Sequence, residues 1–188
     1  MLYERMSTLF AVLSLCAATA TGIVIILAIV QRLTHASVTT RFFAELQPVS
    51  LWVAWFVAAV TMSGSLYYSL VQHLHPCPLC WFQRVCVYPL AAVLLIAALK
   101  KDTKIWRYVM PMAIIGVVVA AYHTQLQAYP DQKGFCNLVD PCNNREVWKF
   151  GFVSLPFMDL TALLLIITLT LTARTVRTPS ADSEEING

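Results

Sequence analysis

LFAVLSLCAATATGIVIILAIV, the stretch Leu9–Val30, contains no charged side chain and decides the fold. A helix rises about 1.5 Å per residue, so about 20 apolar residues cross the roughly 30 Å hydrocarbon core of a bilayer. The stretch therefore predicts a membrane-spanning helix. It is long for the apolar part of a cleaved signal peptide, and the residues before it are barely basic, so we expect the helix to be retained.

Four further apolar stretches follow along the chain. They are Val49–Val71, Phe82–Leu99, Tyr108–Leu126 and Phe152–Ala173. Only Arg84 and Asp159 place a charge inside any of the five. The whole sequence is 59% hydrophobic and 12% charged, which is too little charge to cover a soluble domain of 188 residues. We predict an all-α integral membrane protein, a four-helix transmembrane bundle with an additional N-terminal transmembrane helix.

Basic residues gather between alternate stretches. They are Arg32, Arg41, Lys100, Lys101, Lys104, Arg107, Arg174 and Arg177. By the positive-inside rule this side is cytoplasmic, and the N-terminus, the segment His75–Trp81 and the loop Ala128–Gly151 lie outside. A net charge of +3 without a basic patch gives no support for binding nucleic acid.

The chain divides into three parts on this pattern. Residues 1–47 form the additional N-terminal helix and a cytoplasmic loop, and residues 48–177 form the four-helix core. Residues 178–188 are polar and acidic, a composition that predicts a disordered cytoplasmic tail.

Two cysteines stand just before the third stretch, as Cys77-Pro-Leu-Cys80. Two intervening residues let the thiols meet in a small ring, and such motifs can lower a thiol's pKa well below its free value. The thiolate is the species that attacks a disulfide, so the pair is a candidate redox centre. Two alternative interpretations of the motif remain: half of a zinc site, and an inert disulfide.

A second pair, Cys136 and Cys142, lies in the long outer loop. Asp140-Pro141 favours a turn that would bring the two thiols together, and an oxidising compartment favours a disulfide. The gap is not a usual zinc spacing, so a four-cysteine zinc site is disfavoured and we assign no metal. A static clip remains open for this pair. Cys16 and Cys86 lie within apolar stretches, where cysteine behaves as a small hydrophobe.

Two polar residues lie close to the first pair. Arg84 follows Cys80 by one helical turn, and a charge inside a span needs a reason. A guanidinium beside a quinone carbonyl would stabilise the negative charge that develops as a thiolate reduces the ring. An arginine that snorkels to the interface is the alternative. His123, near the outer end of the fourth stretch, could donate a hydrogen bond or proton there, or be structural.

The order of these motifs resembles that of a known family. The motifs are Cys77-Pro-Leu-Cys80-Trp-Phe-Gln-Arg84, Tyr122-His123-Thr-Gln-Leu-Gln-Ala-Tyr129-Pro130, the loop pair and Gly151-Phe-Val-Ser-Leu-Pro156-Phe-Met158. From about His75 to Leu163 the sequence resembles the DsbB and BdbC membrane thiol oxidases. The chain departs from their four-span pattern in its additional N-terminal span, and its close loop cysteines look like the BdbC branch.

The resemblance implies a catalytic cycle with a quinone, ubiquinone or menaquinone, as electron acceptor. A soluble thioredoxin-like partner of the DsbA or BdbD kind, once reduced, would attack the Cys136–Cys142 disulfide. Cys77, as the exposed member, and Cys80, as the donor to the quinone, would then reoxidise the loop, with Arg84 and His123 lining the ring.

The same resemblance implies a cellular setting. The protein would be a multi-pass protein of a bacterial cytoplasmic (inner) membrane, with its redox cysteines on the extracytoplasmic side. Electrons would leave through the quinone pool to the respiratory chain, as in the DsbA, DsbB and quinone chain that keeps a bacterial periplasm oxidising.

Two alternative functions compete with this interpretation. A vitamin K epoxide reductase-like protein also couples two cysteine pairs to a quinone, but there the loop pair precedes the CxxC, whereas here Cys77 and Cys80 come first. A non-enzymatic membrane scaffold braced by one loop disulfide would account for Cys136 and Cys142. It would leave Arg84 and the CxxC without a role.

Overall fold

Five long helices make up most of the molecule. The computed structural model describes residues 2–34, 37–132, 136 and 142–175. The helices are α1 (Leu2–Thr34), α2 (Ser37–Leu66), α3 (Pro78–Lys100), α4 (Trp106–Ala128) and α5 (Leu155–Thr175). A π-helical turn, Tyr67–Val71, continues α2, a 3₁₀ turn, Thr103–Ile105, precedes α4, and β1 (Trp148–Lys149) pairs antiparallel with β2 (Val153–Ser154). All five helices are long and apolar enough to cross a membrane, which confirms the predicted fold class.

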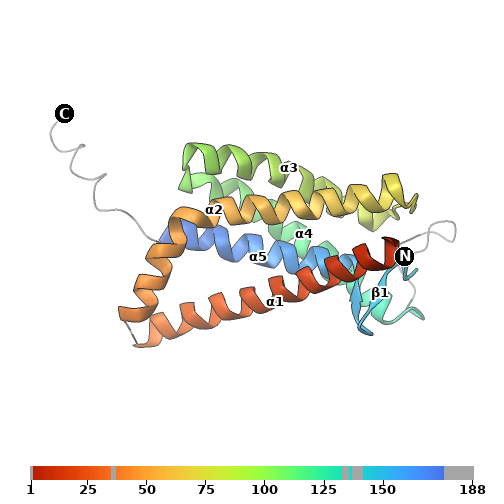
Figure 1. Ribbon diagram of the computed structural model, residues 1–188, viewed down its shortest axis with the longest axis horizontal. Coiled ribbons are helices and arrows are strands. Elements are labelled where there is room, and N and C mark those ends of the chain that lie inside the picture. The colour runs from red at the N-terminus through yellow and green to blue at the C-terminus, as the bar shows by residue number, and fades with distance from the viewer. Residues whose placement is uncertain (1, 35–36, 133–135, 137–141, 176–188) are drawn as a thin grey trace.

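The helices extend beyond the predicted apolar stretches. Residues 37–47, expected to belong to a cytoplasmic loop, are the first part of α2. Pro48 lies inside this helix, and α2 bends near its start (Figure 1). A proline inside a helix removes one hydrogen bond and kinks the helix without having to end it, so the loop was predicted too long. The predicted tail 178–188, Arg177 and the side chain of Arg41 lie outside the described residues.

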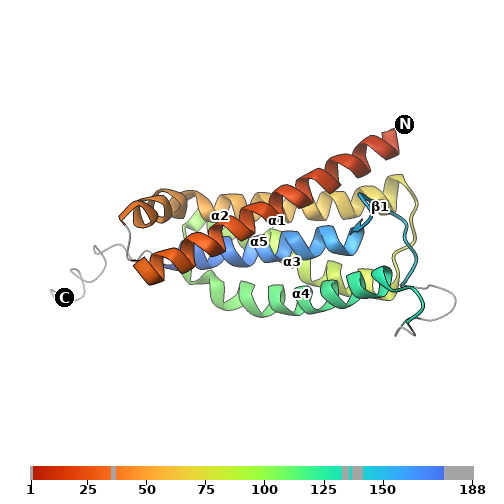
Figure 2. The same ribbon diagram turned by 90° about the horizontal axis from the view of Figure 1, so that it is seen from below.

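Helices α2, α3, α4 and α5 form the core, and α1 lies outside it against α5 and α2 (Figure 2). Only 11% of the spanning residues of α1 are buried, against 50% for α5, so α1 is the peripheral helix. The core combines large and small side chains. They are Leu90, Leu94, Val109, Leu163 and Ile166 with Ala54, Ala58, Ala91, Ala113 and Ala120. Small residues let helix backbones approach closely, which is how membrane helices pack without a hydrophobic driving force.

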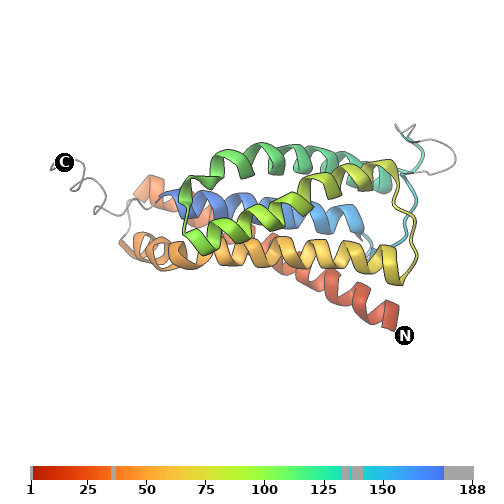
Figure 3. The ribbon, with the colours of Figure 1, turned by 90° about the horizontal axis from the view of Figure 1, so that it is seen from above.

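The connections sort into two ends of the bundle (Figure 3). The N-terminus, the segment that leads into α3 and the α4–α5 connection share one end, which we call the redox end (Figures 1 and 3). The α3–α4 connection and the C-terminus of α5 lie at the other. At that end the guanidinium groups of Arg107 and Arg174 lie 6.0 and 4.0 Å from the ring centre of Trp106. Tryptophan beside basic residues is typical of the membrane interface.

Gly116 tests the close packing of the core. A Cβ atom there would lie 2.9 Å from Leu163 Cδ1 and 3.3 Å from Cys86 Cβ. We expect Gly116→Val to cost about 1–3 kcal/mol of stability by overpacking, read as an earlier thermal unfolding transition in detergent. Gly22→Val is the matched control, because nothing lies within 4 Å of its Cβ position. Equal effects of the two substitutions would contradict the packing described here.

Candidate functional site

Cys77 and Cys80 meet at the N-terminus of α3. Cys77 is the N-cap residue, Pro78 occupies the first helical position, and the Cys80 backbone N–H donates to Cys77 Sγ at 3.4 Å. Proline suits this position because its missing N–H would have had no partner in the helix. The two Sγ atoms are 3.1 Å apart. Capping thus places both thiols side by side, with Cys77 at the positive end of the helix dipole.

The surroundings of Cys77 favour its thiolate. The hydrogen bond with the Cys80 thiol, aided by His123, lowers the pKa of Cys77 to about 4, although burial opposes the shift. When the pair is reduced, Cys77 is therefore a thiolate at neutral pH. A stable thiolate is a good leaving group in disulfide exchange. When Cys77 is bonded to another cysteine and that cysteine is attacked, Cys77 therefore leaves readily.

His123 joins the first pair to the loop. It is 1% exposed on α4, and its Nε2 lies 3.7 Å from Cys77 Sγ and 3.1 Å from the carbonyl oxygen of Cys142. A carbonyl only accepts, so Nε2 carries a proton and donates it. Nδ1 lies 3.4 Å from Gln83 Oε1. The histidine expected to line a quinone ring is placed beside Cys77 and the loop.

The loop pair is a disulfide that covers the first pair. Cys136 and Cys142 are bonded, with their Cα atoms 5.7 Å apart, and the predicted Asp140-Pro141 turn lies outside the described residues. Cys142 is 3% exposed and packs in one cluster with Cys77, Leu79 and Leu126. Cys136 is only partly buried.

This cover corrects one expectation from the sequence. Cys77 was expected to be the exposed member of its pair, but it is 9% exposed and Cys80 is the more accessible thiol. The physical reason is that the loop and Leu126, distant in sequence, pack over Cys77.

The cysteines do not assemble a four-cysteine zinc site. Cys136 and Cys142 are bonded to each other, so neither is available as a thiolate ligand. The ligand atoms of Cys77, Cys80 and His123 lie within 4.8 Å of one another, a group of three. Structural zinc takes four protein ligands, so among the described residues this group is one ligand short.

Polar contacts fasten the chain after Cys142 to the end of α4. Arg145 Nε donates to the Gln127 carbonyl oxygen at 2.7 Å, and Gln127 Nε2 donates to the Asn144 carbonyl oxygen at 2.8 Å. The Arg145 guanidinium also lies 4.1 Å from the ring centre of Trp148. Arg145 thereby satisfies a carbonyl that the helix end leaves without a partner. The loop disulfide is thus held over Cys77 by a fixed attachment.

Arg84 ties α3 to the last turns of α2. Its Nε donates to Ser65 Oγ at 3.0 Å, and its Nη2 donates to the Ser65 carbonyl oxygen at 3.3 Å and to Ser69 Oγ. The guanidinium also lies 5.4 Å from the ring centre of Trp81. These neutral partners accept from Nε and Nη2, and no ion pair among the described residues compensates the positive charge.

A cavity of about 460 Å³ lies between α1, α2, α3 and α5. Cys80 and Arg84 line it, and His123 is not one of the described residues on its wall. Most of its lining is apolar, from Phe56 and Val60 on α2 to Leu165 on α5. A mostly apolar cavity with a few polar groups is the usual form of a small-molecule site.

Two lining residues were not assigned a role from the sequence. Gln83 Nε2 and Asp159 Oδ2 are buried and have no hydrogen-bond partner among the described residues. Asp159 was visible as a charge inside an apolar stretch, and that is the signal that could have found it. Gln83 lies within the motif around the first pair and gave no separate signal.

The two remaining cysteines differ in position. Cys86 is 8% exposed and packs in the interior beside the Gly116 position. Cys16, on α1, lines the cavity that Cys80 and Arg84 share.

Comparison with known proteins places the chain in a family. Residues 47–173 match the family described as disulfide bond formation protein DsbB. Disulfide bond formation protein C of Bacillus subtilis (strain 168) is 42% identical over 121 residues, 63% of this chain and 88% of that protein. A probable disulfide formation protein of Coxiella burnetii (strain CbuK_Q154) is 39% identical over 129 residues, 65% of this chain and 86% of that protein.

A third relative has the same character. Probable disulfide formation protein C of Halalkalibacterium halodurans is 38% identical over 116 residues, 60% of this chain and 84% of that protein. No solved structure matches the chain significantly. With its five spanning helices and its two cysteine pairs, the chain belongs to the DsbB family and is a multi-pass membrane oxidoreductase of disulfide bond formation.

Proposed function

We propose that the protein is a quinone-dependent membrane thiol oxidase that reoxidises a soluble, extracytoplasmic, thioredoxin-like disulfide donor. The observation that carries the proposal is a spatial order. The loop disulfide packs on Cys77, Cys77 contacts Cys80, and Cys80 lines a largely apolar cavity together with Arg84. Electrons that enter at the loop can therefore pass toward the membrane interior by disulfide exchange between the two cysteine pairs.

The first exchange opens the loop disulfide. A thiolate of the reduced partner attacks Cys136, because Cys142 is 3% exposed and Cys136 is the more accessible sulfur. The bond from the partner to Cys136 forms as the Cys136–Cys142 bond breaks, and Cys142 leaves as a thiolate. The partner's second cysteine then displaces Cys136, so the partner is oxidised and the loop holds two thiols.

The second exchange passes the electrons inward. The Cys142 thiolate attacks Cys77 of the oxidised Cys77–Cys80 pair, and Cys80 leaves as a thiolate. Cys136 then attacks Cys142, which restores the loop disulfide and releases Cys77, whose low pKa makes it a good leaving group. His123 donates to the Cys142 carbonyl and contacts Cys77, so it holds the two reacting segments together. The net result is a reduced Cys77–Cys80 pair.

The cavity fits a quinone. Its apolar walls suit the ring and its chain, and Arg84 and Gln83 carry N–H groups suited to carbonyl oxygens. Two polar atoms of the lining, Gln83 Nε2 on α3 and Asp159 Oδ2 on α5, have no hydrogen-bond partner among the described residues. A bound quinone would accept two electrons and two protons from the reduced Cys77–Cys80 pair, which would return to its disulfide. Ubiquinone and menaquinone both present carbonyls of this kind.

We further propose that the redox end faces outward in a bacterial cytoplasmic membrane. The basic residues of the opposite end support this orientation by the positive-inside rule. They are Arg32, Lys100, Lys101, Lys104, Arg107 and Arg174. A partner of the DsbA or BdbD kind would then meet the loop from outside, and the quinone pool would carry electrons to the respiratory chain.

Arg84→Ala should weaken quinone use more than it weakens the fold. A hydrogen bond from a charged group is worth about 1.5–3 kcal/mol, which corresponds to a rise of about 10- to 100-fold in the apparent KM for quinone. Steady-state assays over a range of quinone concentrations measure it, with the Cys136–Cys142 disulfide still formed. Ser69→Ala is the control, since it removes a partner of Arg84 and keeps the charge. An unchanged KM for Arg84→Ala would mean that Arg84 only links α3 to α2 and does not bind quinone.

The soluble partner should be trapped on Cys136. A partner that lacks its own resolving cysteine cannot complete the exchange, so a mixed disulfide should accumulate on a non-reducing gel and map to Cys136 by peptide mass. Cys136→Ser should abolish this species. Cys77→Ser should leave it intact and block electron flow to the quinone, because the loop could be attacked once and not reoxidised. A trapped peptide that contained Cys77 would reverse the proposed order and make the loop pair a static clip.

A further inference from the structure

Helix α1 has no counterpart in the part of the chain that matches the family, which begins at residue 47. It nevertheless supplies one wall of the cavity. Its lining residues are Phe10, Leu13, Ser14, Cys16, Ala17 and Ala20. They recur at the three- and four-residue spacing of one helix face. The face of α1 that turns toward the core is therefore the face that closes the cavity.

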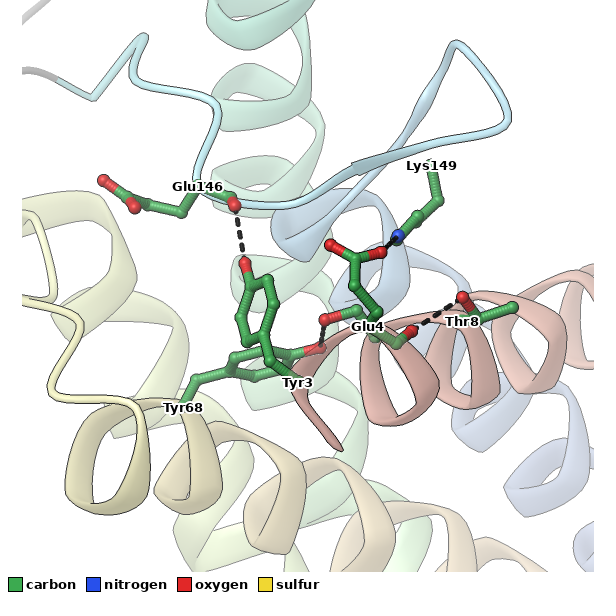
Figure 4. A network of polar contacts seen from close by, with 7 residues as sticks. Tyr3, Glu4, Thr8, Tyr68, Glu146 and Lys149 are labelled. Carbon is green, nitrogen blue, oxygen red and sulfur yellow. Dashed lines mark hydrogen bonds and ion pairs between the residues drawn. The ribbon is translucent and has the colours of Figure 1, made fainter. Parts of the chain in front are cut away.

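The outer end of α1 is fastened to the chain that follows the loop disulfide (Figure 4). Tyr3 donates from its hydroxyl to the Glu146 carbonyl oxygen at 2.8 Å, and Glu4 forms an ion pair with Lys149. Phe150 and Gly151, with φ of 53° and 81°, make the tight turn that follows Lys149. These two contacts hold the start of α1 beside the α4–α5 connection at the redox end.

A close approach to α2 fixes α1 one to two turns deeper. Phe10 lies 5.9 Å from Tyr68 between ring centres, and a Cβ at Gly64 would come within 3.2 Å of Phe10 Cε1. The Tyr68 hydroxyl donates to Ser7 Oγ at 3.2 Å. A Cβ at position 64 would require the ring of Phe10 to shift by a few tenths of an ångström, so the glycine favours this close contact between α1 and α2 beside the cavity.

The chemistry of the α1 wall differs from that of the α3 wall. The α3 wall carries Cys80, Gln83 and Arg84 in its first turns, followed by Val87 and Tyr88. The α1 wall is apolar apart from Ser14, whose hydroxyl donates to the Ala11 carbonyl oxygen of its own helix. From Phe10 to Ala20 the α1 wall is about 15 Å long at 1.5 Å per residue. A long apolar wall opposite a short polar one matches a ligand with a polar ring and an attached hydrocarbon chain.

We propose that α1 is the wall that binds the isoprenoid chain of the quinone, while the α3 wall binds the ring. This inference rests on the proposed quinone use and adds the part of the quinone that α1 recognises. It gives the additional N-terminal helix a function: α1 retains long-chain quinones by covering their chain. It also predicts that α1 contributes little to the binding of a quinone ring that has no chain.

Cys16 can serve as a probe of this wall, because it is an exposed free thiol that also lines the cavity. We would measure alkylation of Cys16 by an apolar maleimide, by mass spectrometry, in the full-length protein with both redox pairs oxidised. A long-chain ubiquinone at ten times its Kd should slow the reaction about tenfold, as occupancy requires. A tail-less ubiquinone analogue at ten times its own Kd should slow it far less.

A matched control separates the cavity face from the lipid face. In a Cys16→Ser background, Thr19→Cys places a thiol on the exposed side of α1 that is not part of the cavity lining. Neither quinone should change its alkylation. Protection of Cys16 by the long-chain quinone alone, without protection at position 19, supports the proposal. Equal rates at Cys16 with and without long-chain quinone, or equal protection by the tail-less analogue, would overturn it.

A second pair of variants tests the role of α1 by quinone affinity, independently of Cys16 alkylation. Ala17→Phe places a phenylalanine inside the cavity on the α1 side, and Thr19→Phe places one outside it. We expect Ala17→Phe to raise the Kd for long-chain quinone and to leave that for the tail-less analogue unchanged. Equal Kd values in the two variants would overturn the role of α1. If the unmodified protein neither binds nor reduces any quinone, the proposed function fails instead, so the two failures are distinguishable.

Discussion

The contact of His123 with Cys77 and Cys142 is the constraint on which the site depends. A buried imidazole on α4 donates to a loop carbonyl and lies 3.7 Å from the sulfur that caps α3. The loop therefore cannot move away from Cys77 without leaving a buried donor unpaired, which costs about 1–3 kcal/mol. This penalty keeps the two cysteine pairs, which are widely separated in sequence, within one apolar cluster.

Charge inside the membrane span is the second organising constraint. Arg84 is held by hydroxyl and carbonyl groups of α2, which accept from Nε and Nη2 without cancelling its charge. The cavity beside it therefore contains a positive potential next to a thiol that can donate electrons. In low-dielectric surroundings such a potential acts strongly on any negative charge that develops on a ligand. The bundle thus keeps the loop disulfide at the redox end apart from the largely apolar cavity that Cys80 lines.

The sequence predicted the elements well and their lateral packing poorly. Five apolar stretches of bilayer length led to five spanning helices, because length and hydropathy are local properties. The start of α2 was missed because Pro48 reads locally as a helix boundary, although a kink suffices. The burial of Cys77 was missed because the loop that covers it begins more than fifty residues later. The contribution of α1 to the cavity was also unpredictable, since hydropathy does not say which faces of membrane helices meet.

Measuring partner disulfide and quinol in one reaction tests the proposed electron flow most directly. The purified protein, supplied with ubiquinone and a reduced thioredoxin-like partner in the absence of oxygen, would be followed for partner disulfide and for quinol together. We expect equal amounts of partner disulfide and quinol, and at most one partner disulfide per protein and no quinol when Cys80 is replaced by serine. Partner oxidation without quinol, or quinol formation that continues in Cys80→Ser, would contradict it.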